Sequence, residues 1–203
     1  MTGSCIKGTA FQAVVDDLQR LAKSGALGEA EIAQRLQAPD VEVLRSGILP
    51  GSWYPIDVYR RMLELLVAKE AGARREQYLH KRGAAASERI LKMGLYNHLE
   101  AALRAAERKP DRWIEQVGRV MTTLSPAMFN FSHWEFVAHD DAKHIFTLDV
   151  TGARDLPEET RILLEGFVAA LFVPFTSDKV EVRSRRPQPD LIHFDGYREH
   201  AAA

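Results

Sequence analysis

The sequence predicts an α+β fold in which a helix-rich N-terminal half leads into a hairpin-helix-hairpin core. Apolar residues recur at helical spacing as far as residue 126. Alternation of apolar and polar residues then indicates strands at Phe131–Ala138 and His144–Val150, and it returns around Val180 and Val182. A helical segment, Leu163–Leu171, separates the two alternating regions. We therefore expect an antiparallel sheet of about four strands covered by helices.

The helical part is expected to span residues 1–126 of a single domain, residues 1–197. Its apolar stripes predict helices around Phe11–Leu21, Ile32–Leu36, Pro55–Ala71, Ala84–Ala106 and Trp113–Leu124. We expect Gly25 to end the first helix, Pro39-Asp40 to open a turn after the second, and Ser125-Pro126 to stop the last.

The sheet-bearing core is expected to span residues 127–197. The polar stretch His139–Lys143 is typical of a hairpin turn between the first two strands. Asp155-Leu156-Pro157-Glu158 resembles a capping box with proline in the first helical turn. Leu191–Asp195 follows a proline-rich break and predicts the last strand. Residues 198–203 have nothing to pack against and are expected to be a disordered tail.

Composition places outer bounds on function. The chain of 203 residues is 46% hydrophobic, which is enough for a sizeable core. Its 27 basic and 28 acidic residues leave a net charge of −1, so no global field attracts nucleic acid or an anionic membrane. The single cysteine, Cys5, excludes an internal disulfide and suits a reducing cytosol. With no signal peptide or long apolar run, we expect a cytoplasmic protein without a membrane span or nucleic-acid partner.

An aromatic cluster, Trp53-Tyr54-Pro55, comes just before the third expected helix. Pro55 suits the first helical turn, and Trp53 would lie ahead of it, able to cover Val58 as a hydrophobic staple. Two interpretations of the chain's aromatic residues stay open: they fill the core, or they line an apolar ligand pocket between helices and sheet. The pocket interpretation assigns the lining to Trp53, Tyr54, Tyr59, Tyr78, Phe129 and Trp134.

Together with Ile6-Lys7-Gly8 near the start, the Trp-Tyr-Pro element resembles a Myxococcus-type paralogous family of similar length and unassigned function. The C-terminal part resembles the wider group of vinyl-reductase-like, haem-NO-binding-like and transport-particle-subunit-like domains. The resemblance covers most of the chain. It implies a helical part followed by a strand-helix-strand core, in a group of ligand sensors and assembly modules. It also implies a homodimer paired through helices, where Ala84-Ala85-Ala86 and Ala101-Ala102 would permit close approach.

The gas-sensing branch of that group makes His80 and His98 candidates for a proximal haem ligand. That branch also holds the haem propionates with a Tyr-x-Ser-x-Arg motif, which this sequence lacks. We therefore expect no resident cofactor, and His98 is kept as a candidate ligand-binding residue beside the aromatic set. Many relatives carry two cysteines around a turn in the last hairpin. The corresponding residues 185–194 contain none, so any role of those thiols is lost.

Two polar clusters are explained more simply by ordinary structure than by a binding site. His133, His139 and His144, with two aspartates between them, are residue types found at zinc and iron sites. A hairpin would separate these histidines, so we expect no metal. The basic run at residues 183–186 lacks the interleaved aromatic side chains of a nucleic-acid surface.

Common enzyme signatures are absent: the sequence has no Gly-x-Ser-x-Gly elbow, no phosphate-binding Gly-x-x-x-x-Gly-Lys and no His-Glu-x-x-His. The sequence and the resemblance therefore favour a non-enzymatic sensory or regulatory module of bacterial signalling, which binds a small apolar ligand or a protein partner as a homodimer. The alternatives are a ligand-free interaction scaffold, an enzyme assembled from scattered residues, and a haem-based gas sensor.

Overall fold

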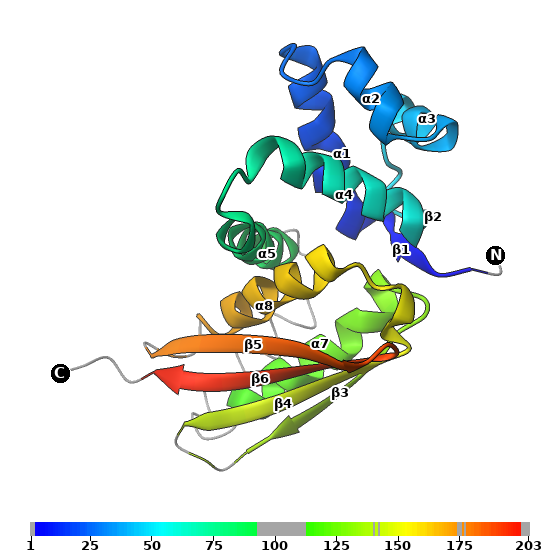
Figure 1. Ribbon diagram of the computed structural model, residues 1–203. Helices are drawn as coiled ribbons and strands as arrows, with labels where there is room; N and C mark the ends of the chain where they lie inside the picture. The colour runs from blue at the N-terminus through cyan, green and yellow to red at the C-terminus, as the bar shows by residue number, and fades with distance from the viewer. Residues whose placement is uncertain are drawn as a thin grey trace. The chain divides into compact units, whose positions relative to one another are not determined.

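The computed structural model describes residues 3–92, 113–139, 141, 143–173, 176 and 178–199. Their contacts divide the chain into two compact units. The first unit comprises the residues up to Tyr78 together with Ala127–Phe131, and the second comprises Leu79–Pro126 and the chain from Ser132 onward. The first is mainly helical and the second carries a four-stranded antiparallel sheet, so the predicted α+β class is confirmed (Figure 1).

The first unit contains α1 (Gly8–Lys23), α2 (Glu29–Arg35), α3 (Ala38–Ser46) and α4 (Ile56–Glu70). Its core lies between α1 and α4, whose apolar residues follow the predicted helical spacing. Phe11 and Leu18 of α1 and Met62 and Leu66 of α4 are fully buried. Burial of one apolar stripe on each helix therefore stabilises this unit.

A short two-stranded ribbon joins the start of the chain to the residues before α4. β1 (Cys5–Lys7) pairs antiparallel with β2 (Trp53–Pro55), and Phe129 adds an isolated bridge to Ile6. The Lys7 ammonium lies 4.6 Å from the centre of the Trp53 ring. The sequence analysis did not predict this ribbon, because three-residue strands show too little alternation to be recognised.

Two expected helix breaks fall inside helices. Pro39-Asp40 lies in the first turn of α3, where the missing proline N–H does no harm and Gln37 and Asp40 form a reciprocal capping box. Ser125-Pro126 lies inside α7 (Trp113–Met128), which continues to Met128. Proline is tolerated there because it is so close to the helix end that little of the hydrogen-bond ladder depends on it.

Two expected boundaries also move. Helix α5 (Arg75–Lys92) begins at Arg75 rather than Ala84, and residues 93–106 of the expected helix lie outside the described residues. The last strand reaches Glu199, so Arg198 belongs to the sheet and not to the expected tail. The backbone N–H of Arg198 donates to the carbonyl oxygen of Lys143 at 2.8 Å, which holds this end of the strand in place.

The second unit is built on a sheet of order β3-β4-β6-β5 (Figure 1). Its strands are β3 (His133–Ala138), β4 (His144–Thr151), β5 (Lys179–Gln188) and β6 (Leu191–Glu199). Both expected hairpins form, and β4 pairs with β6 to join them. Helix α8 (Glu158–Phe172) packs on the sheet. The expected capping box is not formed, because Asp155 lies in the 3-10 turn η2 (Ala153–Asp155) and Pro157 is the N-cap residue.

Stacked phenylalanine rings fill the sheet face that α7 and α8 cover. The ring of Phe146 on β4 stacks with Phe136 of β3 and with Phe172 of α8, with ring centres 5.1 Å apart in both pairs. Two glycines make room for these rings. A Cβ atom at Gly118 of α7 would overlap the ring of Phe136, and one at Gly196 of β6 would overlap the ring of Phe146. This face is therefore packed as closely as a protein core allows.

Helices α5 and α8 cross within the second unit at a distance that only glycine permits. A Cβ atom at Gly83 of α5 would overlap the carbonyl oxygen of Leu163 on α8. In turn, a Cβ atom at Gly166 of α8 would overlap the carbonyl oxygen of His80 on α5. Each helix thus lays its backbone against a glycine of the other.

In the first unit, an ion pair with a fully buried carboxylate joins α3 to α4. Asp40 accepts hydrogen bonds from Nε and Nη2 of Arg61 at 2.6 and 2.7 Å and from the backbone N–H of Gln37 at 2.9 Å. The hydrogen bond to Asp40 raises the pKa of Arg61 above its ordinary value. Each charge compensates the other, and loss of one partner would leave an uncompensated charge at this site.

We predict that Gly166→Ala destabilises the protein by about 1–3 kcal/mol, because the added methyl group must push α5 and α8 apart. Chemical denaturation of both proteins measures this difference. Gly51→Ala is the matched control, since a Cβ atom there meets no atom within 4 Å. Equal losses in the two variants would contradict the close crossing.

We predict that Asp40→Asn lowers the free energy of unfolding by about 3 kcal/mol, because Arg61 loses its charged partner at a buried site. Glu31→Gln is the control, since its ion pair with Lys69 is partly exposed and should contribute less than about 1 kcal/mol. Urea unfolding of the three proteins makes the comparison. A loss at Asp40 no larger than the loss at Glu31 would show that the buried pair is not a major source of stability.

Candidate functional site

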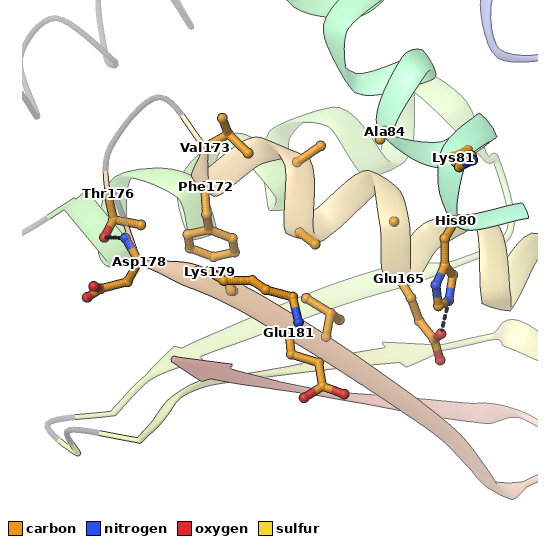
Figure 2. A pocket seen from close by; sticks show the side chains of 15 residues that line it. His80, Lys81, Ala84, Glu165, Phe172, Val173, Thr176, Asp178, Lys179 and Glu181 are labelled. Atoms are coloured by element: carbon orange, nitrogen blue, oxygen red, sulfur yellow. Dashed lines mark hydrogen bonds and ion pairs between the residues drawn. The ribbon is translucent and has the colours of Figure 1, made fainter. Parts of the chain in front are cut away.

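The candidate site is a groove in the second unit, bounded by α5, α8 and β5, with a volume of about 700 Å³ (Figure 2). Small side chains on α5 and α8 form one wall, and the first residues of β5, from Lys179 to Val182, form the other. The lining comprises His80, Lys81, Ala84, Glu165, Gly166, Ala169, Ala170, Phe172, Val173, Thr176, Asp178, Lys179, Val180, Glu181 and Val182.

The groove exists because its helical walls carry little side-chain volume. Gly166, Ala169 and Ala170 follow one another at helical spacing on α8, and Ala84 follows the glycine crossing on α5. These residues line the space beside β5 without filling it. Phe172, which is fully buried, forms an apolar end to the groove. The result is a concave apolar surface of the kind that accepts small ligands.

Glu165 holds the polar end of the groove together. Its Oε1 atom accepts hydrogen bonds from the backbone N–H of Ser184 at 2.9 Å, from the Ser184 hydroxyl, and from Arg161 at 3.1 Å. Its Oε2 atom lies 2.6 Å from Nε2 of His80, as Figure 2 shows. Glu165 thus links α5, α8 and β5 through one carboxylate, whose charge is balanced by Arg161.

The other charged residues of β5 that line the groove are paired away from it. Lys179 bonds to Glu199 at 2.7 Å, and the hydrogen bond to Glu199 raises the pKa of Lys179. Glu181 accepts from Arg183 at 2.9 Å, and this hydrogen bond lowers the pKa of Glu181. Both side chains therefore stay charged at neutral pH while their charges are partly compensated.

Several polar groups of the groove are already held in hydrogen bonds within the protein. Glu165 is saturated with hydrogen bonds, and the Thr176 hydroxyl accepts one from the backbone N–H of Asp178. The groove can accept a ligand whose apolar part lies along it and whose polar group lies at the His80 end.

The aromatic residues expected to line a pocket are distributed over both units. Tyr54 and Tyr59 both contact Phe11 in the first unit, and their ring centres lie 5.7 and 5.3 Å from the centre of the Phe11 ring. The Tyr54 hydroxyl accepts from the backbone N–H of Leu49, and Trp53 lies beside Lys7. Sequence reasoning missed Phe11 as the residue that brings the two tyrosines together, although its place on an apolar helix face was recognised.

The remaining members of that set make contacts of their own. The Tyr78 hydroxyl donates to Glu70 at 2.6 Å, and Phe129 packs on Phe131 with ring centres 5.8 Å apart. Trp134 belongs to the second unit, where its ring N–H donates to the Ser132 hydroxyl at 3.2 Å. His98 lies outside the described residues. The ligand-lining role of the set remains a prediction.

The histidines of the first hairpin join a polar network on the outer sheet face. His139 and His144 approach each other with ring centres 4.5 Å apart, and His144 lies 3.0 Å from Asp195, which also faces His193. His133 is largely exposed and stands apart from them. In the described part of the chain, no group of three or more histidine, cysteine or acidic residues is placed to hold a metal ion.

Sequence reasoning did not predict the groove. The resemblance places the alanines that begin at Ala84 in a dimer contact and not in a pocket. The available signal was the run of small residues on α8, Gly166, Ala169 and Ala170, which recur at helical spacing on one face. That pattern indicates close approach of another element but does not name the element.

Comparison with solved structures identifies the fold. The chain superimposes on an H-NOX protein from K. algicida with a TM-score of 0.62 and 13% identity, covering 96% of this chain and 97% of the other. An H-NOX structure from T. tengcongensis gives 0.58 and 14%, covering 98% and 100%. An oxygen-binding H-NOX domain related to soluble guanylate cyclases gives 0.57 and 14%, covering 96% and 94%.

No protein-family model and no curated protein matches the chain. The identity to the H-NOX structures is low, so the likeness is one of fold. It agrees with the haem-NO-binding-like resemblance of the C-terminal part. No helix in the described ranges is both long enough and apolar enough to cross a bilayer. The chain has the fold of the H-NOX domains.

We predict that Glu165→Gln lowers the free energy of unfolding by about 2 kcal/mol, because the amide presents an N–H group toward one of its donors and removes the charge beside Arg161. Glu158→Gln is the matched control on the same helix, where the exposed carboxylate should contribute less than about 1 kcal/mol. Thermal and urea unfolding provide the measurement. Similar losses in both variants would contradict the linking role of Glu165.

Proposed function

We propose that this chain is a sensory module that binds a small apolar ligand in the groove bounded by α5, α8 and β5. The observation that carries the proposal is the groove itself, a concave surface of about 700 Å³ with small and apolar walls and one polar end. The H-NOX fold supports the sensory part, because the solved structures that share it include an oxygen-binding domain related to soluble guanylate cyclases. The fold by itself implies no ligand.

A solved structure with this fold contains haem, so haem must be considered as the ligand. The described histidines do not fit it. Where a histidine holds the haem iron, one of its ring nitrogens must face the iron. His133 is largely exposed. The other described histidines each have a ring nitrogen held by a polar side chain: His80 by Glu165, His139 by Thr147, His144 by Asp195, and His193 by Asp149 and Asp195 through its two nitrogens. His98 lies outside the described residues.

Among the described residues of the second unit, the inner sheet face is also occupied by its own aromatic side chains. The rings of Phe136, Phe146 and Phe172 stack there, and the glycines opposite them leave room for those rings alone. We therefore propose a sensor that works without haem.

Ligand binding would act through the three elements that bound the groove. A molecule that contacts α5, α8 and β5 together favours the arrangement in which all three are close, and this population shift is the signal. The readout would be a protein partner or a second copy of this chain. We also propose that a second copy of the chain is the partner, as in the predicted homodimer. The aromatic set around Trp53 and Tyr59 would provide a further apolar surface.

The first test is mass spectrometry of freshly purified protein under native and denaturing conditions, with a visible absorption spectrum. We expect extra mass that is lost on denaturation and no Soret band. The native mass also reports the oligomeric state. A Soret band would replace the proposal with the haem reading. A bare polypeptide mass, together with no shift of the melting midpoint for any apolar compound tested, would favour a ligand-free scaffold.

The location of the ligand is tested by Ala169→Leu, which adds volume to the groove wall. We expect this variant to lose the bound mass. Alternatively, it should need at least tenfold more ligand to reach the same rise in melting temperature. Ala30→Leu is the matched control, because Ala30 is an exposed residue of α2 in the first unit. Binding that survives Ala169→Leu would place the ligand elsewhere.

A further inference from the structure

We propose that the ligand of the groove is an amphipathic anion, a medium-chain carboxylate whose head group pairs with Lys81 and whose hydrocarbon chain lies along α8. This inference rests on the proposed function and deepens it by naming the ligand class. It follows from a comparison of the charged residues that line the groove.

Lys81 differs from the other charged residues of the lining. Lys179 is paired with Glu199, Glu181 with Arg183, and Asp178 with Arg198. Glu165 is paired with Arg161 and His80. Lys81, in contrast, has no ion-pair partner within the described ranges of the chain. The groove therefore presents one uncompensated charge, and it is positive, which favours an anionic head group.

The carboxylate of Glu165 does not oppose an anion at this end. Arg161 contacts its Oε1 atom at 3.1 Å and His80 contacts its Oε2 atom at 2.6 Å, so both oxygens face donors. Figure 2 shows His80 and Lys81 next to each other on α5, with Glu165 turned toward His80. The polar end is thus a neutralised carboxylate beside a free ammonium group.

The apolar part of the groove starts one helical turn from that ammonium group. Ala84 follows Lys81 by three residues on α5, so the two lie on the same side of the helix. Along α8, the lining runs from Gly166 to Ala170 and on to Val173, a rise of about 10 Å at 1.5 Å per residue. This length matches a medium hydrocarbon chain.

The chain end of such a ligand would lie against apolar side chains. Phe172 closes the groove and is fully buried, while Val173 at the end of α8 is 73% exposed. An exposed valine beside a groove gains from coverage by a hydrocarbon chain. Lys81 and Val173 therefore stand at the two ends of one amphipathic surface, with the small residues of α8 between them.

The test is calorimetric titration of the full chain with decanoate, decanol and decylammonium, each below its micelle-forming concentration. We expect decanoate to bind about three- to fivefold more tightly than decanol, since Lys81 is exposed and one such ion pair contributes less than about 1 kcal/mol, and decylammonium to bind most weakly. The advantage of decanoate should shrink as salt is raised, because the Lys81 contact is partly exposed to solvent.

Lys81→Gln should reduce decanoate binding to the level of decanol and leave decanol binding unchanged. Lys143→Gln, an exposed lysine on the first hairpin, is the matched control and should change neither. Equal affinity of decanoate and decanol, both abolished by Ala169→Leu, would overturn the inference while the proposed function stands. Absence of binding by all three probes, together with a bare native mass, would instead overturn the proposed function itself.

Discussion

The contact between the backbones of α5 and α8 at Gly83 and Gly166 determines most of what is distinctive in this protein. Because the helices touch there, every side chain near the contact must be small or must point away from it. Ala84 and Ala169 are small and leave the groove open, whereas Glu165 lies beside the contact and bonds to His80 and Ser184. One steric constraint therefore produces both the apolar wall and the polar end of the candidate site.

Side chains alternate between the two faces of the sheet in the second unit, so that its inner face is apolar and its outer face is polar. On the inner face, Phe146 and the rings stacked on it are packed against glycines, so these contacts stabilise the fold. On the outer face, His144, Asp195 and His193 form a polar network near solvent. The groove lies where β5 meets α5 and α8, and there apolar residues such as Val180 stand near the charged side chain of Lys81.

The likeness to H-NOX structures and the differences in chemistry are compatible, because a fold constrains backbone paths more strongly than it constrains the side chains of a site. Identities of 13–14% leave the order of helices and strands intact, as the coverage of nearly the whole chain shows. The same backbone can then hold stacked phenylalanines such as Phe136, and histidines such as His144 that bond to carboxylates. In the proposal, sensing is retained while the ligand changes.

The periodicity of apolar residues and the turn residues were enough, by themselves, to determine the fold class, both hairpins and the helix between them. These features depend on neighbours in sequence: alternation around Phe146 and Val182 and the helical stripe of α8 are local patterns. The helix boundaries predicted at Pro39 and Pro126 were wrong, because a proline near a helix end is compatible with either a start or a stop. Only the tertiary structure decided where the groove lies. Lys81 and Gly83 lie on α5, far in sequence from Glu165 on α8. No local pattern records that the two helices cross at a glycine, or that Lys81 has no ion-pair partner among the described residues.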